Sequence, residues 1–207
     1  MKRSKSSSRW LQEHASDPYV KRAHREGWRS RAAFKLEQIQ RVEKLIRPGM
    51  IIVDLGAAPG GWSQFAARAL QGRGEILALD VLAMPHIPGV TFIEGDFQDQ
   101  AALDRVLVAL GERKVDLVMS DMAPNMSGIA SVDQPRAMNL AELALDFSTQ
   151  VLKPGGDLLM KVFQGAGFQE LVRGARRQFT TVKLRKPDAS RARSAEMYLL
   201  ARSRRMV

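Results

Sequence analysis

Short apolar runs alternate with longer amphipathic stretches along most of the chain. The runs are rich in β-branched residues, as is typical of strands that are buried on both faces. They predict strands at about 51–54, 75–79, 90–93, 115–119 and 157–162. Helical spacing and composition predict helices at about 30–46, 62–71, 99–110, 134–152 and 167–178, the first of them capped by Ser30.

This alternation predicts an α/β fold with a doubly wound, mostly parallel sheet. Two further strands are expected at about 180–185 and 195–201. Only a polar loop joins them, so the seven-stranded sheet should end in an antiparallel hairpin. A chain of 207 residues can bury one core. We therefore expect a basic, disordered tail at 1–15 and a single domain at 16–207.

The stretch from Asp54 to Phe65 carries the first functional signal, because a strand runs through an acid and a glycine-rich loop into a helix. Gly56 and Gly60 let the backbone approach a ligand closely. The sequence predicts a nucleotide site at the carboxyl edge of the sheet. Neither dinucleotide nor phosphate-loop fingerprint is present, and no Lys or Arg lies between Asp54 and Arg68. A positively charged ligand such as S-adenosylmethionine suits this loop; a tight turn without a ligand is the alternative.

Three acids at strand ends accompany this loop, namely Asp54, Asp80 and Asp96. The carboxyl ends of parallel strands meet at one edge, where ligands bind in such folds. We expect Asp80 to accept hydrogen bonds from a ribose diol and Asp96 to face the adenine amino group. Acids also cap strand ends and helices without any ligand, so each one alone is a weak signal.

The ends of the fourth and fifth strands narrow the methyl acceptor. Asp121 is followed by a single Pro and then Asn125, without the aromatic that amino-methyltransferases of DNA bases place there. The chain has no cysteine for a thiolate adduct with cytosine, so a hydroxyl acceptor remains. Lys161 ends an otherwise apolar strand, within reach of the same cleft. A surface lysine that extends its ammonium into water is the alternative.

The net charge of +10 is distributed unevenly. Residues 1–35 carry +7 and 173–207 carry +9, whereas 36–172 carry −6. Basic ends around an acidic body favour a polyanionic partner such as nucleic acid, although solvated surface is the simpler reading for 1–8. Tyr19 and Trp28 lie among basic residues that include Arg29 and Arg31, which we expect to contact phosphates. These aromatics could stack on bases or fix the segment to the core. No run is long enough to span a membrane and no secretory signal is present, so a cytoplasmic location is expected.

Several motifs together resemble the FtsJ/RrmJ ribosomal RNA ribose 2′-O-methyltransferases. The resemblance covers about residues 17–201 and rests on the segments 19–23, 27–36, 54–64, 121–125 and 127–128. It implies a Rossmann-like S-adenosylmethionine methyltransferase, with cofactor contacts from Gly60, Trp62 and Asp121. It also implies a Lys-Asp-Lys-Glu tetrad, which falls here on Lys35, Asp121, Lys161 and Glu196. Trp28 stands where the family often has Tyr, and this keeps an aromatic ring.

The resemblance implies methyl transfer to the 2′-hydroxyl of a uridine in large-subunit (23S) ribosomal RNA, either free or within the large subunit, by a monomer without a metal. Lys161 is the candidate base, and Lys35 would favour its neutral form by like-charge repulsion. Two alternatives remain open. One is a ribose methyltransferase that acts on tRNA or an RNA cap. The other is a non-catalytic RNA-binding assembly factor that keeps an unused cofactor pocket.

Overall fold

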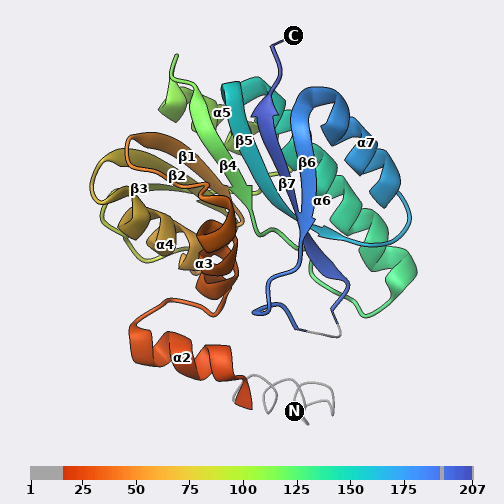
Figure 1. Cartoon of the computed structure of the whole chain (residues 1–207), viewed down its shortest axis with the longest axis horizontal. Coiled ribbons are helices and arrows are strands. Elements are labelled where there is room, and N and C mark those ends of the chain that lie inside the picture. The colour runs from red at the N-terminus through yellow and green to blue at the C-terminus, as the bar shows by residue number, and fades with distance from the viewer. Residues whose placement is uncertain (1–15, 192–193, 207) are drawn as a thin grey trace.

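Within residues 16–191 and 194–206, which the computed structural model describes, seven strands form one sheet in the order β3-β2-β1-β4-β5-β7-β6 (Figure 1). β1 to β5 pair in parallel, and β7 lies antiparallel between β5 and β6. The predicted fold class is confirmed. The strands are β1 (Met50–Leu55), β2 (Gly74–Asp80), β3 (Val90–Glu94), β4 (Val115–Ser120), β5 (Leu152–Phe163), β6 (Phe179–Arg185) and β7 (Glu196–Arg204).

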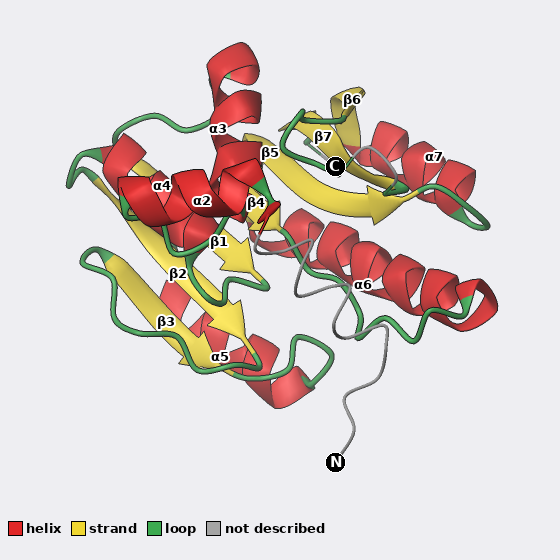
Figure 2. Ribbon diagram, turned by 90° about the horizontal axis from the view of Figure 1, so that it is seen from below, coloured by secondary structure: helices red, strands yellow, loops and turns green. Residues whose placement is uncertain are grey.

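Helices cover both faces of the sheet (Figure 2). One apolar cluster joins α5, α6 and α7 to one face, and a second joins α3 and α4 to the other. α2 attaches more peripherally, through a small cluster that includes Ala23 and Phe34. The helices are α2 (Pro18–Glu26), α3 (Ala32–Glu43), α4 (Gly61–Leu70), α5 (Gln100–Leu110), α6 (Ala130–Val151) and α7 (Phe168–Gln178).

Alternating side chains of the central strands explain the apolar runs. In β1, Val53 and Leu55 pack toward the α5–α7 layer, whereas Ile52 packs toward α3 and α4. A strand that is buried on both faces needs apolar residues at every position rather than at every second one. Leu55 pairs with Leu79 on one side and Ser120 on the other, so β1, β2 and β4 end at one edge.

Two predictions for the first helices were wrong. Ser30 does not cap α3, because Arg31 is the N-cap, already in helical conformation and without a side-chain cap. Ser30 Oγ instead faces the start of α4, where it would collide with a Cβ on Gly61. α3 ends at Glu43, before the expected Ile46, and α2 was not predicted at all.

Two later boundaries also differ from the prediction. α6 begins at Ala130, four residues before the expected Gln134, and Pro135 lies inside it. β5 begins at Leu152 and includes the glycine-containing stretch predicted to be a turn. Its register against β4 shifts between Val115 and Leu117, so the turn residues form an irregular strand start.

The expected basic tail at 1–15 lies outside the described residues, and the single domain stays a prediction. Among the helices that the structure describes, none combines the length and apolar character needed to cross a membrane.

Candidate active site

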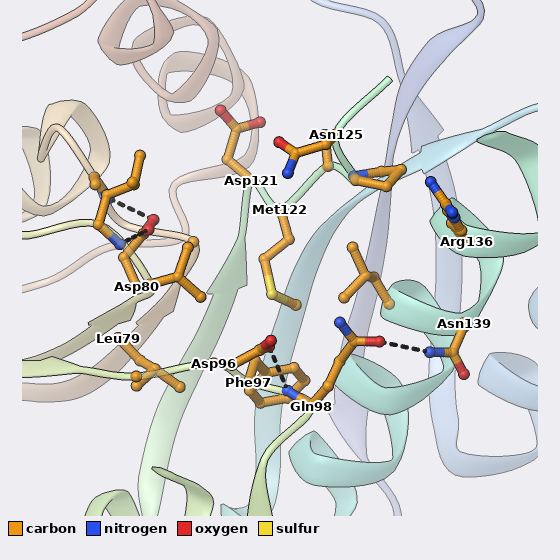
Figure 3. A pocket seen from close by; sticks show the side chains of 18 of the residues that line it. Leu79, Asp80, Asp96, Phe97, Gln98, Asp121, Met122, Asn125, Arg136 and Asn139 are labelled. Carbon is orange, nitrogen blue, oxygen red and sulfur yellow. Dashed lines mark hydrogen bonds between the residues drawn. The ribbon is translucent and has the colours of Figure 1, made fainter. Parts of the chain in front are cut away.

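A pocket of about 800 Å³ opens where β1 to β4 end, and the first turns of α6 close its opposite side. Figure 3 shows Asp80 and Asp96 from the strand ends on one side, and Arg136 and Asn139 from α6 on the other. Four predicted cofactor residues line this pocket, namely Gly56, Asp80, Asp96 and Asp121. The ends of adjacent parallel strands place them together, as their positions in the sequence predicted.

The glycine loop requires glycine at two positions. Gly56 has a φ of 73°, and a Cβ there would lie 2.6 Å from Cγ of Met122, which lines the pocket. Gly60 has a φ of 103°, and a Cβ would meet Ile87 and Met84 at less than 3 Å. A larger residue would be strained in both conformation and contact, so the loop keeps its shape only with glycine.

Asp80 and Asp96 fix the loops around the pocket. Asp80 Oδ2 accepts from the Ala58 backbone N–H at 2.9 Å, and its Oδ1 accepts from the Leu82 N–H at 2.8 Å. Asp96 Oδ1 accepts from the Gln98 N–H at 2.9 Å. Each carboxylate oxygen can accept more than one hydrogen bond. Both acids can therefore hold their loops and still accept hydrogen bonds from a bound molecule.

Asp54 does not line the pocket, contrary to its expected role as a strand-end ligand contact. Its side chain is fully buried, and Ser63 Oγ of α4 donates to its Oδ2 at 2.6 Å. Oδ1 has no hydrogen-bond partner in the described part of the chain. Burial raises the pKa of Asp54 to about 7, and the charges of Asp121 and Asp80 add to the effect. The side chain points toward α4 because neighbouring strand residues alternate between faces.

Trp62 also points away from the pocket. Its Nε1–H donates to the Ala32 carbonyl at 2.9 Å, and its ring centroid lies 5.5 Å from that of Tyr198. The indole therefore packs between α4, α3 and β7. Gly60 lies at the N-cap of α4, outside the residues that line the pocket. Cofactor contacts from the backbone of these two residues stay a prediction.

The tetrad implied by the resemblance is assembled in space. Lys35 comes from α3, Asp121 follows β4, and β5 and β7 supply Lys161 and Glu196. Lys161 Nζ lies 2.9 Å from Asp121 Oδ1 and 3.9 Å from Glu196 Oε2, and Lys35 Nζ lies 2.6 Å from Glu196 Oε1. All four side chains are largely buried. Lys161 is thus not the surface lysine of the alternative reading.

Tyr198 completes this cluster and was missed in the sequence. Its side chain is fully buried, and its hydroxyl contacts Asp121 Oδ1 at 2.7 Å and Glu196 Oε1 at 3.3 Å. Residues i and i+2 of a strand share one face. The spacing of Glu196 and Tyr198 was therefore a usable signal. Ser190, which donates to Glu196 Oε1 at 2.8 Å, comes from a loop that shows no such periodicity.

The cluster holds its two carboxyl groups in the charged form. Burial alone would raise the pKa of Asp121, but the charges of Lys161 and Lys35 outweigh it and hold the pKa below its ordinary value. Glu196 has a lowered pKa for the same reasons, with Lys35 the larger influence. Burial, followed by the charges of Asp121 and Glu196, raises the pKa of Tyr198 well above its ordinary value. Tyr198 therefore remains a hydroxyl that can donate.

The segment 17–31 has a structural role that changes the expectation for its cations. Arg29 donates to the carbonyls of Pro85 and His86 at 2.6 and 2.7 Å. Arg31 pairs with Asp17 and donates to the Ala189 carbonyl. These guanidinium groups bind the protein itself, so the expected phosphate contacts from Arg29 and Arg31 are not supported.

The two aromatics of the same segment pack on α3. Tyr19 and Trp28 lie with their ring centroids 5.6 and 6.4 Å from that of Phe34. Both are half-buried, so they fix the segment to the core rather than presenting free faces to bases. Lys21 and Arg25 are exposed on α2 and remain available to a partner.

The fold, the strand-end pocket and the adjoining tetrad together define a methyltransferase of the Rossmann-like class. The FtsJ-like methyltransferase model matches residues 28–204, and the chain belongs to this family. It is 59% identical over 202 residues to a Pseudomonas paraeruginosa protein named ribosomal RNA large subunit methyltransferase E, with 98% of each chain covered.

Solved structures agree on the fold. A Plasmodium falciparum protein named as a ribosomal RNA methyltransferase superposes with a TM-score of 0.77 at 26% identity, covering 86% of this chain and 98% of that one. The MycE methyltransferase of mycinamycin biosynthesis, solved with Mg, SAH and mycinamycin VI, gives a TM-score of 0.52 at 15% identity. It covers 84% of this chain and 47% of that one, and it supports the fold alone.

Proposed function

We propose that this protein transfers a methyl group from S-adenosylmethionine to the ribose 2′-hydroxyl of a uridine in large-subunit ribosomal RNA. The observation that carries the proposal is the position of Asp121. Asp121 lines the pocket and also contacts Lys161 of the tetrad. A cofactor in the pocket and a hydroxyl at the tetrad would therefore lie on either side of one carboxylate, which brings donor and acceptor together.

The pocket suits S-adenosylmethionine in its chemistry. Asp80 and Asp96 offer carboxylate oxygens where a ribose and an adenine would be held, and the glycine loop leaves space that a Cβ would fill. The loop from Leu55 to Ala67 carries no cation that would repel an ammonium or a sulfonium. When bound, the cofactor supplies a methyl group activated by a positive sulfur.

The tetrad can manage the proton of the acceptor. We assign to neutral Lys161 the acceptance of the hydroxyl proton as oxygen attacks the methyl carbon. Asp121 and Glu196 lie beside the ammonium that forms and stabilise it. The same carboxylates favour protonated Lys161 before reaction, so activity should rise with pH. Lys35, which is held by Glu196, is placed to orient the substrate.

The choice of substrate rests on relatives rather than on the pocket. The Pseudomonas paraeruginosa protein is named for large-subunit ribosomal RNA, and it matches this chain over nearly its whole length. The FtsJ/RrmJ resemblance supports the ribose 2′-hydroxyl of uridine. tRNA and cap RNA are the competing substrates, and the buried, fully paired tetrad speaks against a non-catalytic factor.

Labelled methyl transfer tests the proposal. Purified protein, S-adenosylmethionine with a labelled methyl group and large ribosomal subunits from a strain deleted for this gene are combined, and the RNA is digested to nucleosides. The proposal predicts label in 2′-O-methyluridine from large-subunit RNA. Label in tRNA or capped RNA alone would reassign the substrate. Binding of RNA without any transfer would favour the assembly factor.

A further inference from the structure

The loop between β6 and β7 contacts the tetrad through one residue, Ser190. Its hydroxyl donates to Glu196 Oε1 at 2.8 Å, and its side chain is buried. Lys35 Nζ reaches the same oxygen at 2.6 Å, and the Tyr198 hydroxyl reaches it at 3.3 Å. The other oxygen, Oε2, is the one that faces Lys161. Three donors on Oε1 therefore set which oxygen is turned toward Lys161.

The loop is held in place from the opposite side by the N-terminal helices. Ala189 is fully buried and packs with Ala23 of α2 and Phe34 of α3. Arg31 donates to the Ala189 carbonyl, and the Ala189 N–H donates to Gln38 Oε1 at 3.1 Å. Both backbone groups of Ala189 are thus fixed immediately before Ser190. The serine hydroxyl can then approach Glu196 without the entropy cost of ordering a free loop.

We propose that Ser190 is a positioning residue, which holds the Glu196 carboxylate so that Oε2 faces Lys161 during methyl transfer. This inference rests on the proposed function, because it assigns to Glu196 a role in that reaction. A hydroxyl that donates to a carboxylate also favours its charged form. Ser190 would therefore keep Glu196 ionised as well as oriented.

Substitution of Ser190 tests this role. Ser190→Ala should lower kcat about tenfold, the effect of one hydrogen bond to a charged group, and leave S-adenosylmethionine affinity unchanged. The acid side of its kcat–pH profile should move to higher pH, since Glu196 would gain a proton more readily. Ser190→Thr, which retains the hydroxyl, should restore most of kcat. Ser148→Ala is the matched control, because Ser148 is a buried serine whose hydroxyl donates to the Leu145 carbonyl in α6.

The outcomes are distinguishable when kcat is measured on large subunits with labelled S-adenosylmethionine. Wild-type kcat and an unshifted profile in folded Ser190→Ala would overturn the inference. Equal loss in Ser190→Ala and folded Ser190→Thr would overturn it too, because the hydroxyl would not be the operative group. If wild type itself transfers no methyl group to ribose, the proposed function fails instead, whatever the variants do.

Discussion

Lys161 and Asp121 are joined by two contacts, since Lys161 Nζ lies 2.9 Å from the Asp121 carboxylate and donates to the Asp121 carbonyl at 2.8 Å. The lysine side chain is only 8% exposed. Two partners on one residue fix the amine at the end of β4, beside the pocket. Conversion of a free amine into an ammonium at this point is stabilised by a carboxylate that burial makes more effective.

Asp80 should control cofactor affinity. Asp80→Ala leaves the Ala58 and Leu82 amides without their acceptor and removes the expected ribose contact, so S-adenosylmethionine binding should weaken by about 1–3 kcal/mol. Calorimetry measures this directly. Asp104→Ala, an exposed acid on α5, is the control and should bind normally. Tight binding of NAD or ATP, with none of S-adenosylmethionine, would contradict the assignment of the pocket.

Tyr198 should tune the tetrad through its hydroxyl. Tyr198→Phe keeps the ring contact with Trp62 but removes the hydrogen bond that helps to lower the pKa of Asp121. We expect kcat to fall by about tenfold and cofactor affinity to be preserved, the loss expected for one charge-assisted hydrogen bond. The measurement is kcat against pH together with calorimetry. A variant that is as active as wild type at every pH would show that the hydroxyl is not needed.

Asp54 should make stability depend on pH. Its folded pKa of about 7 lies above the ordinary value of 3.8, so the folded state keeps the proton that the unfolded chain loses. Stability should therefore fall as pH rises from about 4 to about 7, by up to about 1.4 kcal/mol per pH unit, and then level off. Asp54→Asn cannot ionise, so its stability relative to wild type should increase across that window. Urea unfolding at several pH values checks this, and parallel curves for the two proteins would contradict it.

The exposed cations of α2 should contribute to RNA affinity. Lys21→Gln with Arg25→Gln removes two positive charges near the active-site edge, and each lost phosphate contact should flatten the log–log salt dependence by about 0.7–0.9. Arg176→Gln with Arg177→Gln is the matched control on α7, which lies far from α2 (Figure 1). RNA binding over a salt series provides the slopes. A flatter slope in the α7 pair than in the α2 pair would place the RNA surface elsewhere.

The sequence predicted the fold and the pocket wherever a periodic pattern carried the information. Apolar runs located the central strands, and parallel order placed Asp80, Asp96 and Asp121 together. The orientation of Trp62 could not be predicted, because the helical phase at the first turn of α4 depends on packing against α3. Ser190 lies in a loop without periodicity, and the internal bonds of Arg31 depend on contacts more than 150 residues away in the chain.

The Lys161→Arg variant tests the central claim most directly. Guanidinium stays protonated and cannot accept the hydroxyl proton, whereas it keeps the positive charge beside Asp121. The measurement is the single-turnover rate of methyl transfer with S-adenosylmethionine and large subunits both bound, over a pH series. If Lys161 is the base, the wild-type rate should rise with pH, and Lys161→Arg should lose roughly 10²–10⁴ of it, as should Lys161→Ala. Substantial activity in Lys161→Arg would contradict the account and leave Lys161 as an electrostatic anchor for the hydroxyl.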